Sequence, residues 1–296
     1  MKIIFMGSSE FAIPTLLKLL TIPELEVVEV YSKPPKPKGR GLQTVITPIH
    51  SIALQHDLSV KTPSSLKEEI LQDCDVIVVV SYGLILPNSV LAHPRIAAIN
   101  IHPSLLPRWR GPSPIQYTLL GGDKEAGVSI IDVTQELDAG AIYAQEFIIL
   151  DGTETYSALH DRLAILGASM LCDVVRNIRN IKPIPQIAEE ATYTKKLPNS
   201  VDVDFEESVE IFFRKLRVFG AVFAEAFDMR IKIVEASLSD AHLYTDELGL
   251  VFKKETKELF LQFRDGKVLI KIVQPVNKKK MPVRDFLNGI SNIVNL

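Results

Sequence analysis

Residues 97–116 read AAINIHPSLLPRWRGPSPIQ, and this stretch predicts both a strand of the main sheet and the edge at which chemistry takes place. Its apolar first part predicts a buried strand in which Asn100 and His102, two residues apart, share one face. Pro103 cannot donate to a strand ladder, so we expect the strand to end at His102 and a loop to begin. The carboxyl ends of strands border the ligand crevice in open α/β sheets. The stretch therefore predicts a strand that presents an amide and an imidazole to a cleft.

Apolar runs of strand length alternate with helical patterns through the first two-thirds of the chain. The other runs that predict strands are KIIFMG (2–7), ELEVVEVYS (24–32), CDVIVVVSYG (74–83), GVSIIDV (127–133) and IYAQEFIIL (142–150). Helices are predicted at EFAIPTLLKLL (10–20), at SSLKEEILQ (64–72) and over 157–175, where apolar residues recur at helical spacing. Such alternation is typical of an α/β fold with a parallel-rich sheet and helices on both faces.

The pattern changes towards the C-terminus, and we expect two domains joined by a linker. The boundaries that we expect are 1–188 for the first domain, 189–206 for the linker and 207–296 for the second domain. A helix is predicted over 208–219, followed by short strands and a hairpin turn at Asp265-Gly266, which is typical of a small antiparallel β-barrel. From Glu206 onward the chain carries 15 Lys and Arg against 13 Asp and Glu, whereas the preceding part is acidic. An anionic partner and a chance asymmetry both explain this difference.

Composition and charge exclude several classes of function. The net charge of −3 over 296 residues gives no global attraction to nucleic acid or to anionic membranes, so such a partner needs a local patch. Cys74 and Cys172 are interpreted as reduced core thiols. The apolar run from Val76 is too short to span a bilayer and no signal-peptide cleavage site is present, so we expect a cytoplasmic protein without a membrane partner. The histidines lack ligand spacing and Ser9 replaces the second glycine of a dinucleotide loop, so neither a metal nor a nicotinamide cofactor is expected.

The residues at the end of the strand suit acyl transfer. The Asn100 amide offers N–H donors to an oxyanion, and the His102 imidazole exchanges a proton near neutral pH. Asp138, in the turn QELDAG, is the best candidate for a carboxylate that orients the ring. From spacing alone, turn-capping or surface roles are the commoner explanation of such residues, and both interpretations stay open. The chain has no G-x-S-x-G motif, so we expect no covalent acyl-enzyme.

The run NIHPSLLPRWRG, together with LDAG downstream, closely resembles the N10-formyltetrahydrofolate-dependent formyltransferases. The opening MKIIFMGSSEF, the basic loop PPKPKGRG, the turn SYGLILP and the segment TYTKKL are also similar to that family, and the resemblance covers nearly the whole chain. Within the family, the chain is most similar to the members that formylate methionyl-tRNA. The fold that this implies is a Rossmann-like domain followed by an OB-like barrel.

The resemblance also implies a reaction and a set of site residues. The formyl group of 10-formyltetrahydrofolate would pass to the free amino group of methionyl-initiator tRNA by direct amine attack, in support of translation initiation. By their match to the family pattern, the catalytic residues are Asn100, His102 and Asp138, the folate-binding residues are Ser104, Leu105, Leu106 and Pro107, and the tRNA-binding residues are Arg40, Lys36 and Lys38. We expect a monomer, and a cis peptide bond between Leu106 and Pro107.

Three other functions stay open at this point. The first is formyl transfer to another amine, such as a sugar nucleotide or glycinamide ribonucleotide, although the Arg40 loop and the terminal β domain favour a macromolecular acceptor. The second is hydrolysis of formyl-folate, with water as the acceptor. The third is a non-catalytic tRNA-binding module, which leaves Asn100 and His102 unexplained. Trp109 is interpreted as a packing anchor rather than a base-stacking platform, and Lys278 to Lys280 as a solvated turn or a phosphate contact.

Overall fold

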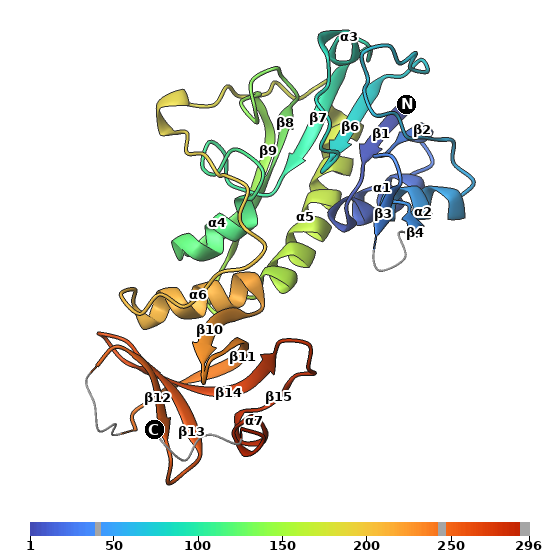
Figure 1. The fold of residues 1–296 in the computed structure, drawn as a ribbon. Helices are drawn as coiled ribbons and strands as arrows, with labels where there is room; N and C mark the ends of the chain where they lie inside the picture. The colour runs from blue at the N-terminus through green and yellow to red at the C-terminus, as the bar shows by residue number, and fades with distance from the viewer. Residues whose placement is uncertain (39–42, 242–246, 291–296) are drawn as a thin grey trace. The chain divides into compact units, whose positions relative to one another are not determined.

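The computed structural model describes residues 1–38, 43–241 and 247–290, and the chain divides into two compact units. The first unit comprises Met1–Thr118, Lys124–Leu150 and Ser157–Lys195, and the second comprises Leu119–Asp123, Asp151–Tyr156 and Lys196–Leu296. The second unit therefore includes two short segments that interrupt the first unit along the sequence. Figure 1 follows the chain through both units.

A seven-stranded sheet forms the centre of the first unit, with the strand order β5-β2-β1-β6-β7-β8-β9 (Figure 1). Its strands are β1 (Lys2–Gly7), β2 (Glu26–Tyr31), β5 (Val60–Lys61), β6 (Val76–Val80), β7 (Ala97–His102), β8 (Glu125–Asp132) and β9 (Ile142–Ile149). Pairing is parallel from β5 to β7, whereas β8 runs antiparallel to β7 and β9 antiparallel to β8. The expected parallel-rich α/β sheet is confirmed, and its last two strands are antiparallel.

The middle strands of this sheet are apolar because helices and loops cover both of its faces. Every residue of β6 is buried. The helices that precede residue 200 are η1 (Glu10–Ala12), α1 (Ile13–Leu20), α2 (Pro48–Gln55), α3 (Asn88–Leu91), α4 (Pro114–Gly121), α5 (Tyr156–Asn177) and η2 (Ala188–Glu190). The long helix α5 packs on the face of β7 that bears Ile101, since a Cβ on Gly167 would lie 2.8 Å from the Ile101 Cγ2 atom. Asn100 and His102 alternate with Ile101 and therefore point to the other face.

The expected helix at SSLKEEILQ (64–72) is wrong, because the chain there is irregular. Leu66 and Leu71 are both buried in the core beside β6, whereas Ile70 is 85% exposed. Two residues five positions apart lie on different sides of a helix, so a helix would not bury both leucines against one surface. The segment instead crosses the core with a turn at residues 66–69, and the Lys61 ammonium donates to the Ile70 carbonyl at 3.1 Å.

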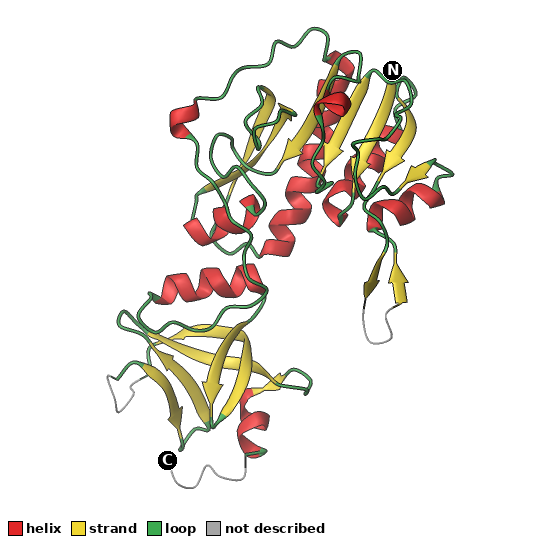
Figure 2. Ribbon diagram, turned by 45° about the horizontal axis from the view of Figure 1, so that its top comes forward, coloured by secondary structure: helices red, strands yellow, loops and turns green. Residues whose placement is uncertain are grey.

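The second unit is an antiparallel half-barrel, which confirms the expected β domain (Figure 2). Its strand order is β10-β11-β14-β13-β12, with β15 beside β14. The elements are α6 (Val209–Phe219), β10 (Val222–Ala226), β11 (Met229–Ser239), β12 (Gly249–Lys253), β13 (Glu258–Gln262), β14 (Lys267–Pro275), β15 (Met281–Pro282) and α7 (Val283–Asn288). The predicted hairpin at Asp265-Gly266 connects β13 to β14, where the Phe263 N–H donates to the Gly266 carbonyl at 2.9 Å.

Local signals explain where α6 begins and ends. The Ser208 hydroxyl accepts a hydrogen bond from the Ile211 N–H, and the Asp265 carboxylate of the hairpin accepts one from the Val209 N–H. These two acceptors satisfy donors that the first turn of a helix leaves free. The helix ends at Gly220, whose φ of 68° is the left-handed conformation that glycine adopts without strain.

The two cysteines are free thiols in the core, as expected. Cys74 and Cys172 are both buried, and burial raises the pKa of each thiol to about 11. Neither thiol is therefore ionised near neutral pH. No helix among the described residues combines the length and the apolar character that crossing a membrane requires.

Candidate active site

The candidate site lies where β7 ends, at the carboxyl edge of the parallel strands. Asn100 pairs with Val79 of parallel β6 and with Ile131 of antiparallel β8, and His102 pairs with Ser129 of β8. The strand ends at His102, as the following proline predicted. Asn100 is half-buried, whereas His102 is only 4% exposed. Neighbouring strands thus hold the backbone at Asn100 from two sides and at His102 from the side of β8.

The turn after β8 brings Asp138 to the imidazole. The Asp138 Oδ2 atom lies 3.6 Å from the His102 Nδ1 atom and accepts a hydrogen bond of 2.8 Å from the Gly111 N–H. The other ring nitrogen, Nε2, lies 2.9 Å from the Trp109 carbonyl oxygen. Burial lowers the pKa of His102, and the Asp138 carboxylate and the Trp109 carbonyl oppose that shift. Two of the three catalytic candidates are therefore in contact, and Asn100 shares their edge through its place on β7.

The contact to Trp109 determines which nitrogen of His102 carries a proton in the neutral ring. A carbonyl oxygen only accepts hydrogen bonds, so His102 Nε2 must carry the hydrogen. The lone pair of a neutral His102 is then on Nδ1, which faces Asp138. A proton that enters between the ring and the carboxylate is stabilised by both groups. The pair is therefore built to take up one proton and release it.

The loop after β7 is held by hydrogen bonds from the neighbouring strands. The Ser129 hydroxyl donates to the Ser104 carbonyl at 2.7 Å and accepts from the Leu106 N–H at 3.2 Å. The Gln145 side-chain amide of β9 donates to the Leu106 carbonyl at 2.9 Å. The peptide bond from Leu106 to Pro107 is cis, as expected. The Ser104 hydroxyl donates to the Arg108 carbonyl at 2.6 Å, so this expected folate contact also belongs to the framework of the loop.

Two further loops meet near the site. Sequence reasoning noted both turns but assigned no role to their apolar residues Ile85 and Leu137. The Gln135 side-chain amide donates to the Leu86 carbonyl at 3.2 Å, which joins the turn after β8 to the loop after β6. Each loop exposes a large apolar side chain, since Ile85 is 89% exposed and Leu137 is 58% exposed. These two side chains are available for contact with a ligand that has apolar surface.

A buried arginine also belongs to the site and was missed by sequence reasoning. Arg110 is 2% exposed, and its guanidinium donates to the side-chain oxygen of Gln186 twice, at 3.1 and 2.9 Å. The amide nitrogen of Gln186 donates to the carbonyls of Asp138 and Gly140, both at 2.8 Å. Arg110 stands within the PRWRG run, but nothing in the sequence pattern pairs it with a residue 76 positions away.

The basic candidates lie on a separate two-stranded sheet, β3 (Lys36–Lys38) with β4 (Gln43–Val45). Lys36 is exposed, Lys38 ends β3, and Arg40 lies outside the described residues. Lys33, at the base of this segment, lies against the loop after β6, since a Cβ on Gly83 would lie 2.1 Å from the Lys33 Nζ atom. Burial and the nearby Lys36 lower the pKa of Lys33.

Trp109 packs against Arg108 of its own loop and Tyr117 of α4, which favours its interpretation as a packing anchor. Its ring centroid lies 5.3 Å from that of Tyr117, and the Arg108 guanidinium lies 4.1 Å above the indole. At the far end of the chain, Lys278 to Lys280 are exposed, which leaves both interpretations of that run open.

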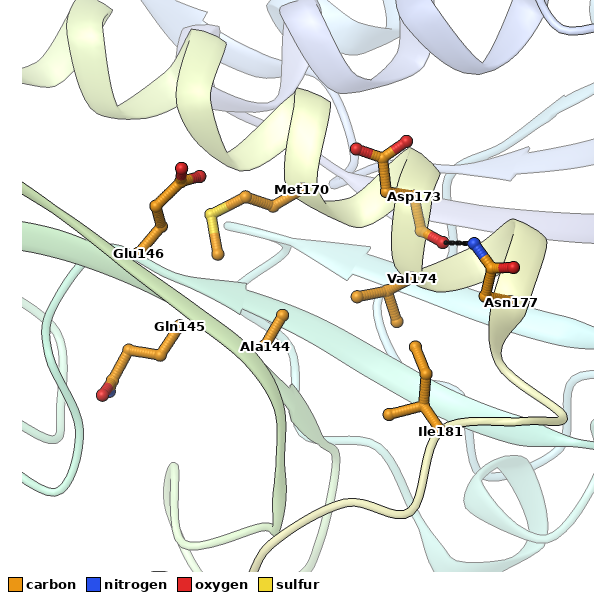
Figure 3. Close-up of a pocket in the computed structure, with 8 residues that line it drawn as sticks. All are labelled: Ala144, Gln145, Glu146, Met170, Asp173, Val174, Asn177 and Ile181. Atoms are coloured by element: carbon orange, nitrogen blue, oxygen red, sulfur yellow. Dashed lines mark hydrogen bonds between the residues drawn. The ribbon is translucent and has the colours of Figure 1, made fainter.

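A different hollow, of about 530 Å³, lies between β9 and α5 (Figure 3). Its lining consists of Ala144, Gln145, Glu146, Met170, Asp173, Val174, Asn177 and Ile181. It includes none of Asn100, His102 and Asp138, and Figure 3 shows the Gln145 side chain directed away from the other lining residues. The edge of the sheet therefore remains the candidate site on chemical grounds. Within the described part of the chain, no three His, Cys, Asp or Glu side chains gather as metal ligands.

Comparison with known proteins shows the family of the chain. Residues 1–175 match the family profile described as formyl transferase, and residues 198–291 match that of the formyl transferase C-terminal domain. The methionyl-tRNA formyltransferase of Ehrlichia chaffeensis is 41% identical over 98% of both chains, and that of Anaplasma marginale is 40% identical over 100% of this chain and 98% of its own.

Solved structures share the fold at lower identity. WlaRD, a sugar 3N-formyl transferase solved with dTDP and 5-N-formyl-THF, has a TM-score of 0.68 at 19% identity and covers 94% of this chain and 99% of its own. HypX from Aquifex aeolicus, solved with tetrahydrofolic acid, has a TM-score of 0.61 at 17% identity and covers 96% of this chain and 46% of its own. Both profiles and the full-length relatives lead to one conclusion: the chain belongs to the formyl transferase family.

Proposed function

We propose that this chain transfers the formyl group of 10-formyltetrahydrofolate to the amino group of methionyl-initiator tRNA. The observation that carries the proposal is the His102–Asp138 contact beside Asn100, at the carboxyl edge of the sheet. Full-length relatives at about 40% identity bear the name of this activity. The reaction supplies formylated methionyl-tRNA for translation initiation, and we place it in the cytoplasm with the chain acting as a monomer.

In the proposed mechanism the neutral amine attacks the formyl carbon directly. The carbonyl electron pair moves onto the formyl oxygen, and the Asn100 amide donates to the oxyanion. The attacking nitrogen loses a proton to the His102–Asp138 pair, in which the imidazole and the carboxylate share it. Collapse of the intermediate breaks the bond between the formyl carbon and N10, and N10 takes the proton. Only bonds of the two substrates are made and broken, so no covalent enzyme intermediate arises.

The donor is proposed to bind across the loops that surround the pair. Ser104 to Pro107 form one wall, in which hydrogen bonds from Ser129 and Gln145 hold the backbone. Ile85 and Leu137 offer apolar surface to a flat ring system. Two structural neighbours were solved with folate compounds, in support of a folate site in this fold.

The acceptor is proposed to meet the basic segment after β2. Lys36, Lys38 and Arg40 supply positive charge there, and phosphate contacts position a nucleic acid without reading its sequence. The second unit is the proposed tRNA-binding domain. Its presence does not by itself argue for a macromolecular acceptor, because the fold of a sugar 3N-formyl transferase covers 94% of this chain. The basic segment and the identity to full-length relatives therefore carry this part of the proposal.

A formylation assay with alternative acceptors tests the proposal. Purified chain is supplied with 10-formyltetrahydrofolate and, separately, methionyl-initiator tRNA, an aminoacylated elongator tRNA, a dTDP-amino sugar, or buffer alone. We expect rapid formylation of the initiator tRNA and little reaction in the other three arms. If the amino sugar is formylated faster than the initiator tRNA, the proposed acceptor is wrong. If formate is released in buffer alone, the chain hydrolyses the donor and the proposed transfer is wrong.

A further inference from the structure

We propose that Arg110 and Gln186 are positioning residues that fix the His102–Asp138 pair. Together with the backbone of Trp109 and Gly111, they determine which His102 nitrogen carries a proton and where the Asp138 carboxylate lies. The effect on catalysis rests on the proposed function, whereas the effect on the imidazole does not.

Three consecutive residues, 109 to 111, connect to the two members of the pair, two of them directly and one through Gln186. The Trp109 carbonyl accepts from His102 Nε2, and the Gly111 N–H donates to Asp138 Oδ2. Between them, the Arg110 side chain reaches the backbone of Asp138 through Gln186. A shift of residues 109–111 therefore moves the imidazole and the carboxylate in a coupled way.

Gln186 can connect Arg110 to the turn that bears Asp138, because its side-chain amide has both an acceptor oxygen and a donor nitrogen. Its oxygen must face the guanidinium of Arg110, which only donates, so its nitrogen faces the carbonyls of Asp138 and Gly140. Those carbonyls belong to a tight turn, in which Asp138 has a φ of 51° and a Cβ on Gly140 would lie 1.9 Å from the Asp132 carbonyl oxygen. The amide of Gln186 thus holds the turn from outside.

Stability alone is a weak reason for burying Arg110. A buried guanidinium loses its hydration, and its carboxylate partner Glu136 is 70% exposed, which weakens the ion pair. The neutral Gln186 oxygen and the Tyr193 hydroxyl, 3.2 Å from Nη1, are its other partners. The desolvation of Arg110 is understandable if its hydrogen bonds fix the geometry of the reacting groups.

The backbone of residues 109–111 is fixed independently of Gln186. The Arg110 N–H donates to the Thr192 carbonyl at 2.8 Å, and the Thr194 N–H donates to the Arg110 carbonyl at 2.7 Å. The Thr192 hydroxyl also accepts from the Trp109 N–H at 2.9 Å. A substitution at Gln186 should therefore loosen the turn that bears Asp138 and leave this segment folded.

The test compares Gln186→Glu with Gln72→Glu, which adds the same charge at an exposed position of the first unit. A carboxylate at position 186 keeps an acceptor for Arg110 but cannot donate to the two carbonyls. We expect kcat to fall about 10- to 100-fold with KM for the folate donor little changed, because the reacting groups are misplaced rather than removed. Wild-type kcat in Gln186→Glu, or an equal loss in Gln72→Glu, would overturn the proposal.

Nitrogen NMR of ¹⁵N-histidine-labelled protein gives a readout that does not need turnover. We expect His102 to stay the Nε2–H tautomer in both proteins, because Trp109 is held independently of Gln186. The Nδ1 resonance should shift in Gln186→Glu, because the Asp138 carboxylate that faces this nitrogen is displaced. An unchanged Nδ1 resonance would also overturn the proposal. If no acceptor is formylated but the Nδ1 resonance still responds, the proposed function fails and the positioning role stands. Should Gln186→Glu not fold, Arg110→Lys serves instead, since it keeps the charge and loses the second contact to Gln186.

Discussion

Two segments follow the carboxyl ends of parallel strands in this molecule, and they are built in opposite ways. Residues 103–111, after β7, are held by hydrogen bonds to β8, β9 and residues 192–194. The segment after β2 instead forms the separate sheet of β3 and β4, where Lys36 is exposed. The first segment is held on several sides beside His102, and the second presents charge. Under the proposed function, the difference teaches that one sheet edge combines a fixed part for chemistry with a charged part for binding.

The largest expected effect is a loss of turnover on substitution of the residues that precede the first segment, Asn100 and His102. Asn100→Ala or His102→Ala should lower kcat about 10²- to 10³-fold, because a lost oxyanion donor or proton carrier acts on the transition state. Substrate affinity should change little. Steady-state kinetics with unfolding curves as the folding control measures this, and near-normal turnover of folded Asn100→Ala would contradict the assignment.

The close packing of the first segment predicts a loss of stability in Gly111→Ala. Gly111 has a φ of 110°, and a Cβ there would lie 2.8 Å from the Thr194 carbonyl oxygen. Gly152 is the matched control, since its φ is 90° but a Cβ there would meet nothing within 4 Å. Both variants bear the cost of an unfavourable φ, about 1–3 kcal/mol, and only Gly111→Ala adds a steric clash. Urea unfolding should rank Gly111→Ala as the less stable; equal free energies of unfolding would argue against close packing here.

The sequence predicted those parts of the fold that depend on local signals. The strand over 97–102 and the hairpin at Asp265-Gly266 follow from apolar patterning, a proline and turn residues, so they were found within a residue or two. Strand direction carries no such signal, and the antiparallel course of β8 and β9 appeared only in the structure. The acidic and apolar residues of 64–72 fit a helix locally, but tertiary burial of both leucines overrode that preference.

The candidate site was predictable to the extent that its residues stand close together in the sequence. Asn100 and His102 follow from strand periodicity. Asp138 was the best candidate by its place in a polar turn, and the resemblance strengthened it, because nothing local distinguishes it from an ordinary turn aspartate. Gln186 lies beyond α5, and its contact to Arg110 depends on how distant segments pack. Such contacts need the fold before they can be seen.

The buried imidazole of His102, which directly precedes the first segment, predicts a dependence of stability on pH. Burial lowers the pKa of His102 below its ordinary value, so the folded chain binds a proton there less readily than the unfolded chain. The free energy of unfolding should therefore fall as the pH drops through about 6.5, by about 1.4 kcal/mol for each unit of lowered pKa. Urea unfolding from pH 8 to 5 should show a shallower dependence in His102→Asn and the wild-type dependence in Lys36→Gln. The same dependence in all three proteins would show that His102 is not the group responsible.

The smallest effects should come from the second segment, and they separate its two lysines. The Lys36 side chain is exposed, whereas Lys33 is half-buried against Gly83, with no partner for its ammonium among the described residues. A desolvated cation gains more from an arriving phosphate than a hydrated one does, so Lys33→Gln should raise KM for the acceptor tRNA more than Lys36→Gln. Each lost phosphate contact should lower the slope of log KM against log salt by about 0.7–0.9, with kcat unchanged. Lys67→Gln, at an exposed position of the irregular segment 64–72, is the charge-matched control. A fall in kcat for Lys33→Gln would place this residue with the rigid segment instead, and the division between chemistry and binding would then lie at β3 rather than at the end of β2.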